Sequence, residues 1–129
     1  MEECFSNSDG MLFVVLTCIG RGKKLTLYNI ISAADYIDRA IPTLEMINDG
    51  LSRLESNGYI EILDGRVYHT EKFRRFDKQN RQRFELIIPK QLRYSKIFAN
   101  MVMERPVVYK EYFTEEEYKI FRQSSRYYN

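Results

Sequence analysis

Hydrophobic residues recur at helical spacing in the stretch TLEMINDGLSRLESN, residues 43–57. They follow one another at intervals of three and four positions, as Leu44, Ile47, Leu51 and Leu54. This spacing puts all four on one face of an amphipathic helix. Thr43 is a typical N-cap, and the pair Asn57-Gly58 is typical of a helix C-terminus. We therefore predict a helix between Thr43 and Asn57.

Two short runs with β-strand composition come directly after this helix. They cover Tyr59–Leu63 and Arg66–Thr70 and are joined by Asp64-Gly65. Asp-Gly between alternating apolar residues is the strongest short-range hairpin signal, because the tightest turns need positive φ at both central positions. The pattern predicts a two-stranded β-hairpin.

Two more helices are predicted on the N-terminal side. The first begins at a cap on Ser8 or Asp9 and ends at Ile19. It is apolar on nearly all sides, as expected of a helix buried on most of its surface. The second covers Leu27–Asp38 and is followed by the turn 39–42, whose closing proline disfavours helical geometry at the residue before it.

Residues 25–27 are interpreted either as a short first strand or, through Thr26, as the cap of the second helix. The order helix, short strand, helix, four-residue turn, helix and hairpin, from Asp9 to Thr70, resembles the winged helix-turn-helix superfamily. The string DYIDRAIPTLEMINDGLSRLESNGYI is also similar to small bacterial proteins of unassigned role. The resemblance implies a DNA-binding fold and brings no catalytic residue with it.

Further helices are expected after the hairpin. One runs from Glu71 to about Ile88, and Pro89 separates it from another over Lys90–Met103. A capping box at Thr114–Glu117 begins a last helix that runs to about Ser124. The apolar residues expected to face inward are Phe73, Phe76, Phe84 and Ile87 in the first of these and Tyr94, Ile97, Phe98, Met101 and Val102 in the second.

The expected fold is therefore mainly α with a small β-hairpin, a winged helix-turn-helix followed by a C-terminal helical extension. Residues 1–70 form the winged-helix domain, and residues 71–129 form the extension. The extension either packs back on the first domain or forms the seam of a homodimer. Residues 107–112 have strand-like composition, and the pattern does not define the fold of residues 104–113.

The charges are unevenly distributed along the 129 residues, although the net charge is only +2. Residues 1–65 hold ten acidic and five basic residues, a balance of −5. Residues 66–96 hold ten basic and three acidic residues, a balance of +7, and the remainder is balanced. Such a split favours a polyanionic partner, and double-stranded DNA is the partner that the resemblance implies.

No set of residues has the spacing of a catalytic or metal site. His69 is the single histidine, and no acidic or thiol partner lies near it in the sequence. The loop GRGKK at 20–24 lacks the spacing of a phosphate-binding P-loop. Helix capping accounts for the glutamates 115–117, and Cys18 is expected to pack as a small hydrophobe. We expect no catalytic residue, no metal and no cofactor.

Basic residues of the hairpin and the following helix are the best candidates for contact with nucleic acid. The helix at 43–57 leads with Glu45 and Asp49, which phosphates repel, and its outward residues are Glu45, Met46, Asp49, Ser52, Arg53 and Ser56. A row of cations at intervals of four and three residues follows the hairpin. The predicted nucleic-acid-binding residues are Arg53, Arg66, Arg74, Arg75, Lys78 and Arg81.

The expected function is that of a non-enzymatic DNA-binding protein, a transcriptional regulator of the cytoplasm. The alternative is a protein–protein interaction module on a winged-helix scaffold, whose acidic third helix does not bind DNA. The longest apolar run, residues 11–19, falls short of the ~20 residues that cross a bilayer, so no membrane partner is expected.

Overall fold

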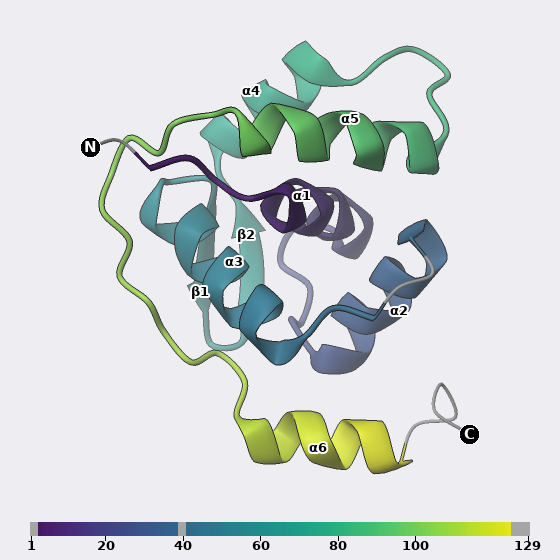
Figure 1. Cartoon of the computed structure of the whole chain (residues 1–129), viewed down its shortest axis with the longest axis vertical. Helices are drawn as coiled ribbons and strands as arrows, with labels where there is room; N and C mark the ends of the chain where they lie inside the picture. Colours follow the sequence, from purple (N-terminus) through teal and green to yellow (C-terminus); the bar gives the residue numbers. More distant parts are fainter. Residues whose placement is uncertain (1–2, 39–40, 125–129) are drawn as a thin grey trace.

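Helix α1, Asn7–Ile19, lies at the centre of the structure, and other elements pack around it (Figure 1). The computed structural model describes residues 3–38 and 41–124. Within these residues α1 is followed by α2 (Leu27–Asp38), α3 (Leu44–Ser56), β1 (Ile60–Leu63), β2 (Arg66–His69), α4 (Glu71–Asn80), α5 (Ile87–Ala99) and α6 (Glu115–Ser124). The described part is mainly helical with one two-stranded antiparallel hairpin, which confirms the predicted fold class at this level.

The central position of α1 follows from its composition, because every residue from Asp9 to Leu16 is buried, as predicted. The helix begins earlier than predicted: Ser6 is the cap, and its amide donates to the Asp9 carboxylate at 2.8 Å. Cys18 is exposed, so the prediction that it packs as a small hydrophobe is wrong. It lies beyond the buried stretch of the helix.

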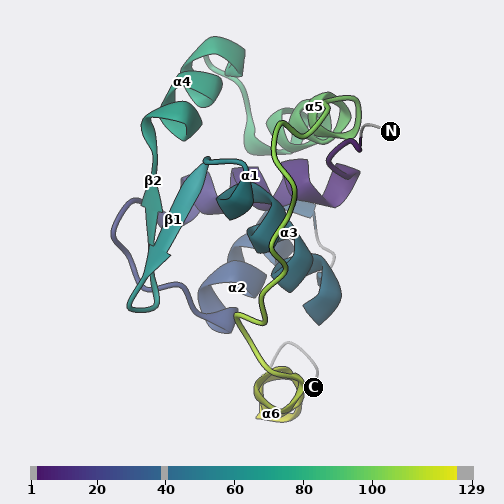
Figure 2. The same cartoon turned by 90° about the vertical axis from the view of Figure 1, so that its left-hand side faces the viewer.

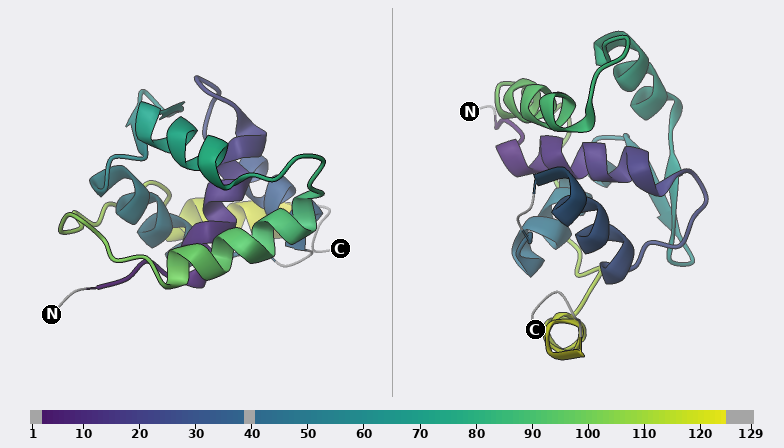
Figure 3. Two further views of the ribbon diagram at one scale, coloured as in Figure 1. Left: turned by 90° about the horizontal axis from the view of Figure 1, so that it is seen from above. Right: turned by 90° about the vertical axis from the view of Figure 1, so that its right-hand side faces the viewer.

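α5 crosses α1 at close range (Figure 3). Gly10 permits this approach, because a Cβ atom at that position would lie 2.4 Å from the Tyr94 carbonyl oxygen. Tyr94 and Phe98, both predicted to face inward, are fully buried. The helical extension therefore contributes to the same core as the first helix.

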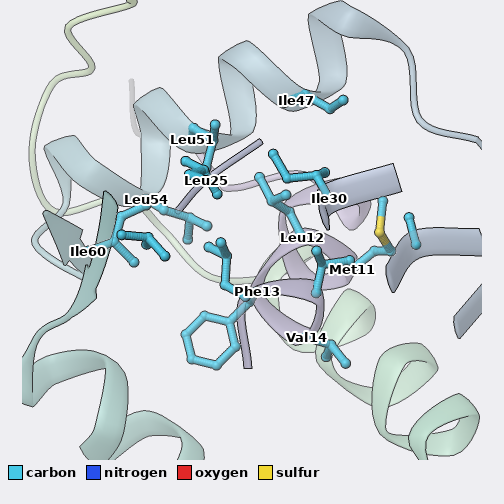
Figure 4. Close-up of a cluster of buried hydrophobic side chains, with 14 of the residues drawn as sticks. Met11, Leu12, Phe13, Val14, Leu25, Ile30, Ile47, Leu51, Leu54 and Ile60 are labelled. Atoms are coloured by element: carbon cyan, nitrogen blue, oxygen red, sulfur yellow. The ribbon is translucent and has the colours of Figure 1, made fainter. Parts of the chain in front are cut away.

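The apolar stripe that the sequence predicts for α3 packs on the other side of α1 (Figure 4). Ile47, Leu51 and Leu54 are buried beside Leu12 and Phe13 of α1. The start and end of the helix also agree with the prediction: the Thr43 hydroxyl accepts from the Met46 amide, and Asn57 is the C-cap. The predicted turn 39–42 lies partly outside the described residues, which resume at residue 41.

The predicted hairpin forms, and its register places Leu63 opposite Arg66. Asp64 and Gly65 have φ values of 52° and 70°, as a tight two-residue turn requires. Residues 22–25 pair with the free edge of β2: the Gly22 amide donates to the Val67 carbonyl at 2.6 Å, and Lys24 forms a bridge with Arg66. Residues 25–27 do not themselves form a strand, so that interpretation is wrong. The pairing centres on an isolated bridge at Lys24, and α2 already begins at Leu27.

The other interpretation of this segment is confirmed, because the Thr26 hydroxyl accepts from the Asn29 amide at 3.0 Å. Thr26 therefore caps α2, whose bounds agree with the predicted ones.

α4 ends at Asn80, and the prediction that it continues to Ile88 is wrong. Arg81 already has extended backbone, and Phe84 has a φ of 62°. Phe73 is buried as predicted, but Phe84 is 87% exposed. The helical spacing of apolar residues continues past Asn80 in the sequence, but Phe84 lies outside the hydrophobic core.

α5 starts and ends earlier than predicted, over Ile87–Ala99 in place of Lys90–Met103. Pro89 lies in its first turn, where the missing N–H of proline removes no helical hydrogen bond. Val102, predicted to face inward, is 40% exposed and forms an isolated bridge with Cys4. Residues 107–112, whose composition is strand-like, do not form a strand.

The last helix begins as predicted. The Glu117 amide donates to the Thr114 hydroxyl, and the Thr114 amide donates to the Glu117 carboxylate, both at 3.1 Å. This reciprocal capping box defines the start of α6.

Candidate nucleic-acid interface

Residues 104–113, which we call the strap, lie in extended form along the outer side of α3 (Figure 2). Four side chains at the C-terminal end and along one side of α3 accept hydrogen bonds from backbone amides of the strap. Glu104 and Arg105 donate to Asn57 Oδ1, Val108 to Ser56 Oγ, Lys110 to Ser52 Oγ, and Tyr112 and Phe113 to Asn48 Oδ1, at 2.9–3.1 Å. The helix thus binds the strap by its backbone, which explains why no apolar pattern marks the segment.

The strap removes much of the predicted outer face of α3 from solvent. Ser52, predicted to face outward, is fully buried, and Asn48 is buried as well. Tyr112 adds a side-chain contact, since its hydroxyl donates to the Glu55 carboxylate. The strap would have to be displaced before this side of α3 could contact the bases of a nucleic acid.

Arg53, the one cation in the sequence of α3 and a predicted contact, faces its own fold. Its Nη1 lies 3.2 Å from Asp9 Oδ1, and its guanidinium lies 5.8 Å from the centre of the Tyr109 ring. Burial raises the pKa of Asp9, whereas Arg53 and hydrogen bonds from Ser6 act in the opposite direction. The charge of Arg53 therefore stabilises a buried carboxylate of α1.

Acidic side chains dominate what remains accessible near the start of α3. Glu45 and Asp49 line a shallow cavity of about 710 Å³ between α3, the strap and α6. Glu111, Glu115 and Glu116 are also among its lining residues. Phosphate groups are repelled by such a surface.

Cations gather instead along β2, α4 and the segment that joins α1 to α2, on one side of the molecule (Figure 2). Arg66 belongs to β2, and its Nη1 donates to the Gly22 carbonyl at 3.0 Å. We call the surface formed by these elements the basic face, with the exposed residues Arg21, Lys23, Lys24, Arg66, Arg74, Lys78 and Arg81.

Three members of this face come from the loop at 20–24 and are not among the contacts that the sequence predicts. The pairing of Lys24 with Arg66 brings them beside β2, although more than 40 residues separate the two segments. The only feature of the sequence that could indicate this contribution is the density of cations in GRGKK.

Arg74, Lys78 and Arg81 line one shallow cavity of about 330 Å³ beside His69 and α1. Arg74 donates to the His69 carbonyl at 2.6 Å and is exposed. Lys78 is exposed and forms no ion pair with any described residue. Arg75 lies outside this cavity and pairs with Glu71 at 2.8 Å, where both side chains are exposed.

Asp77 contributes a negative charge to the same cavity, but the fold neutralises it. Its carboxylate accepts from the Tyr94 hydroxyl at 2.7 Å and lies 2.9 Å from Lys90 Nζ. Arg81 is more distant, at 3.8 Å, and its side chain is 60% exposed. The cations of the row therefore keep most of their positive potential for a partner.

His69 lies under this row and is buried. Its Nε2 is 2.9 Å from the Leu16 carbonyl oxygen, which can only accept, so Nε2 carries the proton. Burial lowers the pKa of His69, and the positive charges of Arg74 and Arg21 lower it further, against the opposing effect of the Leu16 carbonyl. The imidazole is therefore neutral near pH 7 and has a structural role.

No protein-family model, curated protein or solved structure matches the chain. Residues 3–38 and 41–124 bring no three His, Cys, Asp or Glu side chains into a group that would hold a metal ion. Nor does any helix among them have the length and apolar character needed to cross a bilayer.

Proposed function

We propose that the protein is a non-enzymatic nucleic-acid-binding protein built on a winged-helix scaffold. It binds the phosphates of duplex DNA with the basic face, and α3 does not read bases while the strap is in place. The observation that carries the proposal is the continuity of cations from Arg66 in β2 to Arg81 after α4, on a surface where Asp77 is neutralised within the fold.

The scaffold part of the proposal is supported by the order of elements. Helix α1, the pairing segment 22–25, α2, α3 and the hairpin follow one another as in a winged helix-turn-helix. In that class the hairpin is the wing, and Arg66 lies beside its tip.

The dimensions of the basic face suit a polyanion. Arg74 to Arg81 span about 10 Å, from a rise of 1.5 Å per residue, and Arg66 to His69 add about 10 Å at strand spacing. Duplex DNA carries one phosphate charge per about 1.7 Å of its axis, so several phosphates face a surface of this length. A regulator that selects sequences through α3 would in addition have to release the strap.

A titration of the full chain with a short mixed-sequence duplex, followed by fluorescence anisotropy at several salt concentrations, tests the proposal. If each of four cations contacts one phosphate, the slope of log affinity against log salt should be about −3.6. These cations are Arg66, Arg74, Lys78 and Arg81. No binding at low salt would refute the proposal.

The acidic cavity supports a second candidate, a protein–protein interaction module. Glu45, Asp49 and the glutamates of the strap and α6 offer a concave negative surface that suits a basic segment of a partner protein. This function predicts no salt-dependent duplex binding, and loss of the partner when Glu45 and Asp49 are neutralised.

A further inference from the structure

Four large apolar side chains between the end of α4 and the middle of α5 are exposed to solvent. The exposed fractions are 87% for Phe84, 75% for Leu86, 51% for Ile88 and 56% for Leu92. They belong to the loop that projects beyond α4 and to the adjoining part of α5 (Figure 1). Apolar clusters of this kind on a surface mark binding sites.

Phe84 is held in an unfavourable backbone conformation. It is the third residue of a turn that the Glu85 amide closes by donating to the Gln82 carbonyl at 3.2 Å. A positive φ at this position, here 62°, normally selects glycine or asparagine. The Glu85 carboxylate is bound by Arg93 at 3.0 Å and 2.5 Å, which fixes the turn. The fold thus presents an aromatic ring where a glycine would cost less.

The surroundings of this ring are positively charged. The Arg83 guanidinium lies 4.9 Å from the Phe84 ring centre, and Arg81 precedes it. The neighbouring acids Asp77 and Glu85 are paired within the fold. A partner must therefore offer apolar surface and negative charge together.

The arrangement of the cations along the surface distinguishes an anionic membrane from a linear polyanion. They extend from the apolar loop along α4 to β2, down the side of the molecule (Figure 2). A flat anionic bilayer that touches the loop would not reach the cations of β2, whereas a linear polyanion can follow the whole track. Nucleic acid fits this arrangement, since its bases have apolar faces and its backbone is charged.

We propose that Phe84 stacks on a nucleobase that is not paired in a duplex, while Arg81 and Arg83 bind the adjoining phosphates. This inference rests on the proposed function of the basic face and adds a preference for nucleic acid with a single-stranded extension. Stacking on an aromatic side chain is sequence-tolerant, because every base has a π-face.

The test compares a blunt duplex with the same duplex carrying a single-stranded tail that contains 2-aminopurine. The parent should bind the tailed duplex on the order of tenfold more tightly, from the usual contribution of one stacked base, and quench the fluorescent base. Phe84→Ala should abolish this preference without changing the salt slope, because the ring is uncharged. Phe84→Trp should retain the preference.

Two variants control for folding. Phe84→Gly suits the positive φ, so its melting temperature should equal or exceed that of the parent while the preference is lost. Val108→Ala, an exposed apolar position of the strap, should leave the preference unchanged.

Other results would overturn the inference. Equal binding of blunt and tailed duplex by the parent refutes the role of Phe84 and leaves the proposed function standing, whereas no binding of either refutes both. If Phe84→Ala converts a dimer to a monomer in sedimentation and keeps the tail preference, the cluster is a contact between two copies of the chain. If it abolishes capture by phosphatidylserine vesicles and keeps that preference, the cluster binds lipid.

Discussion

Asn48 of α3 holds Phe113 of the strap by both backbone groups, although 65 positions separate the two residues. Its Nδ2 donates to the Phe113 carbonyl at 2.9 Å, and its Oδ1 accepts from the Phe113 amide at 3.1 Å. The same Oδ1 accepts from the Tyr112 amide at 3.1 Å. This single side chain thus fixes the C-terminal end of the strap on the face with which a winged helix-turn-helix would read DNA.

Asn48→Ala should release this end of the strap. The loss leaves two amides and one carbonyl without their partner, which should lower the free energy of unfolding by about 2–4 kcal/mol. The amides of Tyr112 and Phe113 should exchange hydrogen faster than they do in the parent, whereas the exchange rates of the α1 amides should not change. Asp49→Ala, one position along the helix, should change stability by less than about 0.5 kcal/mol. Unchanged exchange at Phe113 would mean that Asn48 does not hold the strap.

Gly10→Ala should separate α5 from α1. The new Cβ would lie 2.4 Å from the Tyr94 carbonyl oxygen and 2.6 Å from the Ser95 Cα, so backbone must move. Overpacking of this kind should cost about 3 kcal/mol, measurable by urea unfolding. Cys18→Ala, at an exposed position of the same helix, is the control and should be nearly neutral. Full stability of Gly10→Ala would contradict the observed helix crossing.

Stability should depend on pH through His69. Because the pKa of His69 in the fold lies below its ordinary value of 6.5, the unfolded chain binds this proton more readily. The free energy of unfolding should therefore be greatest above pH 6.5 and fall as the pH drops from 6.5 towards the folded-state pKa. Urea unfolding between pH 5 and 8 measures this effect.

His69→Gln is the matched variant, because its amide can still donate to the Leu16 carbonyl. It should weaken the dependence on pH in this range. His69 is the only histidine of the chain, so its imidazole signals in NMR give the pKa directly. A value above 6.5 would contradict the burial described for this side chain.

The sequence was most informative where local patterns agree with packing. The stripe from Leu44 to Leu54 and the Asp64-Gly65 turn specify α3 and the hairpin by themselves, because helical spacing and positive φ are local properties. The spacing does not predict the end of α4, because helical spacing continues to Phe84, and only the tertiary structure shows that this ring is 87% exposed.

The strap could not be predicted, because it is bound through its backbone by Asn48, Ser52, Ser56 and Asn57, and backbone binding leaves no pattern in its own side chains. Among the candidate site residues, the sequence correctly places Arg74, Lys78 and Arg81 side by side, because their spacing is helical. Arg53 was not separable from them by sequence, since its partner Asp9 is 44 residues away.

Neutralisation of the α4 row shows whether the basic face, and not α3, binds nucleic acid. The triple variant Arg74→Gln, Lys78→Gln, Arg81→Gln removes three phosphate contacts, so the slope of log affinity against log salt for a mixed-sequence duplex should become less negative by about 2.7.

Two controls complete this measurement. Lys119→Gln removes a cation on α6, at the opposite end of the molecule from α4 (Figure 1), and should leave the slope unchanged. Glu45→Gln with Asp49→Asn should leave the affinity unchanged or raise it. If the triple variant binds duplex with the slope of the parent, or if the parent binds no duplex at low salt, the basic face is not the nucleic-acid-binding surface.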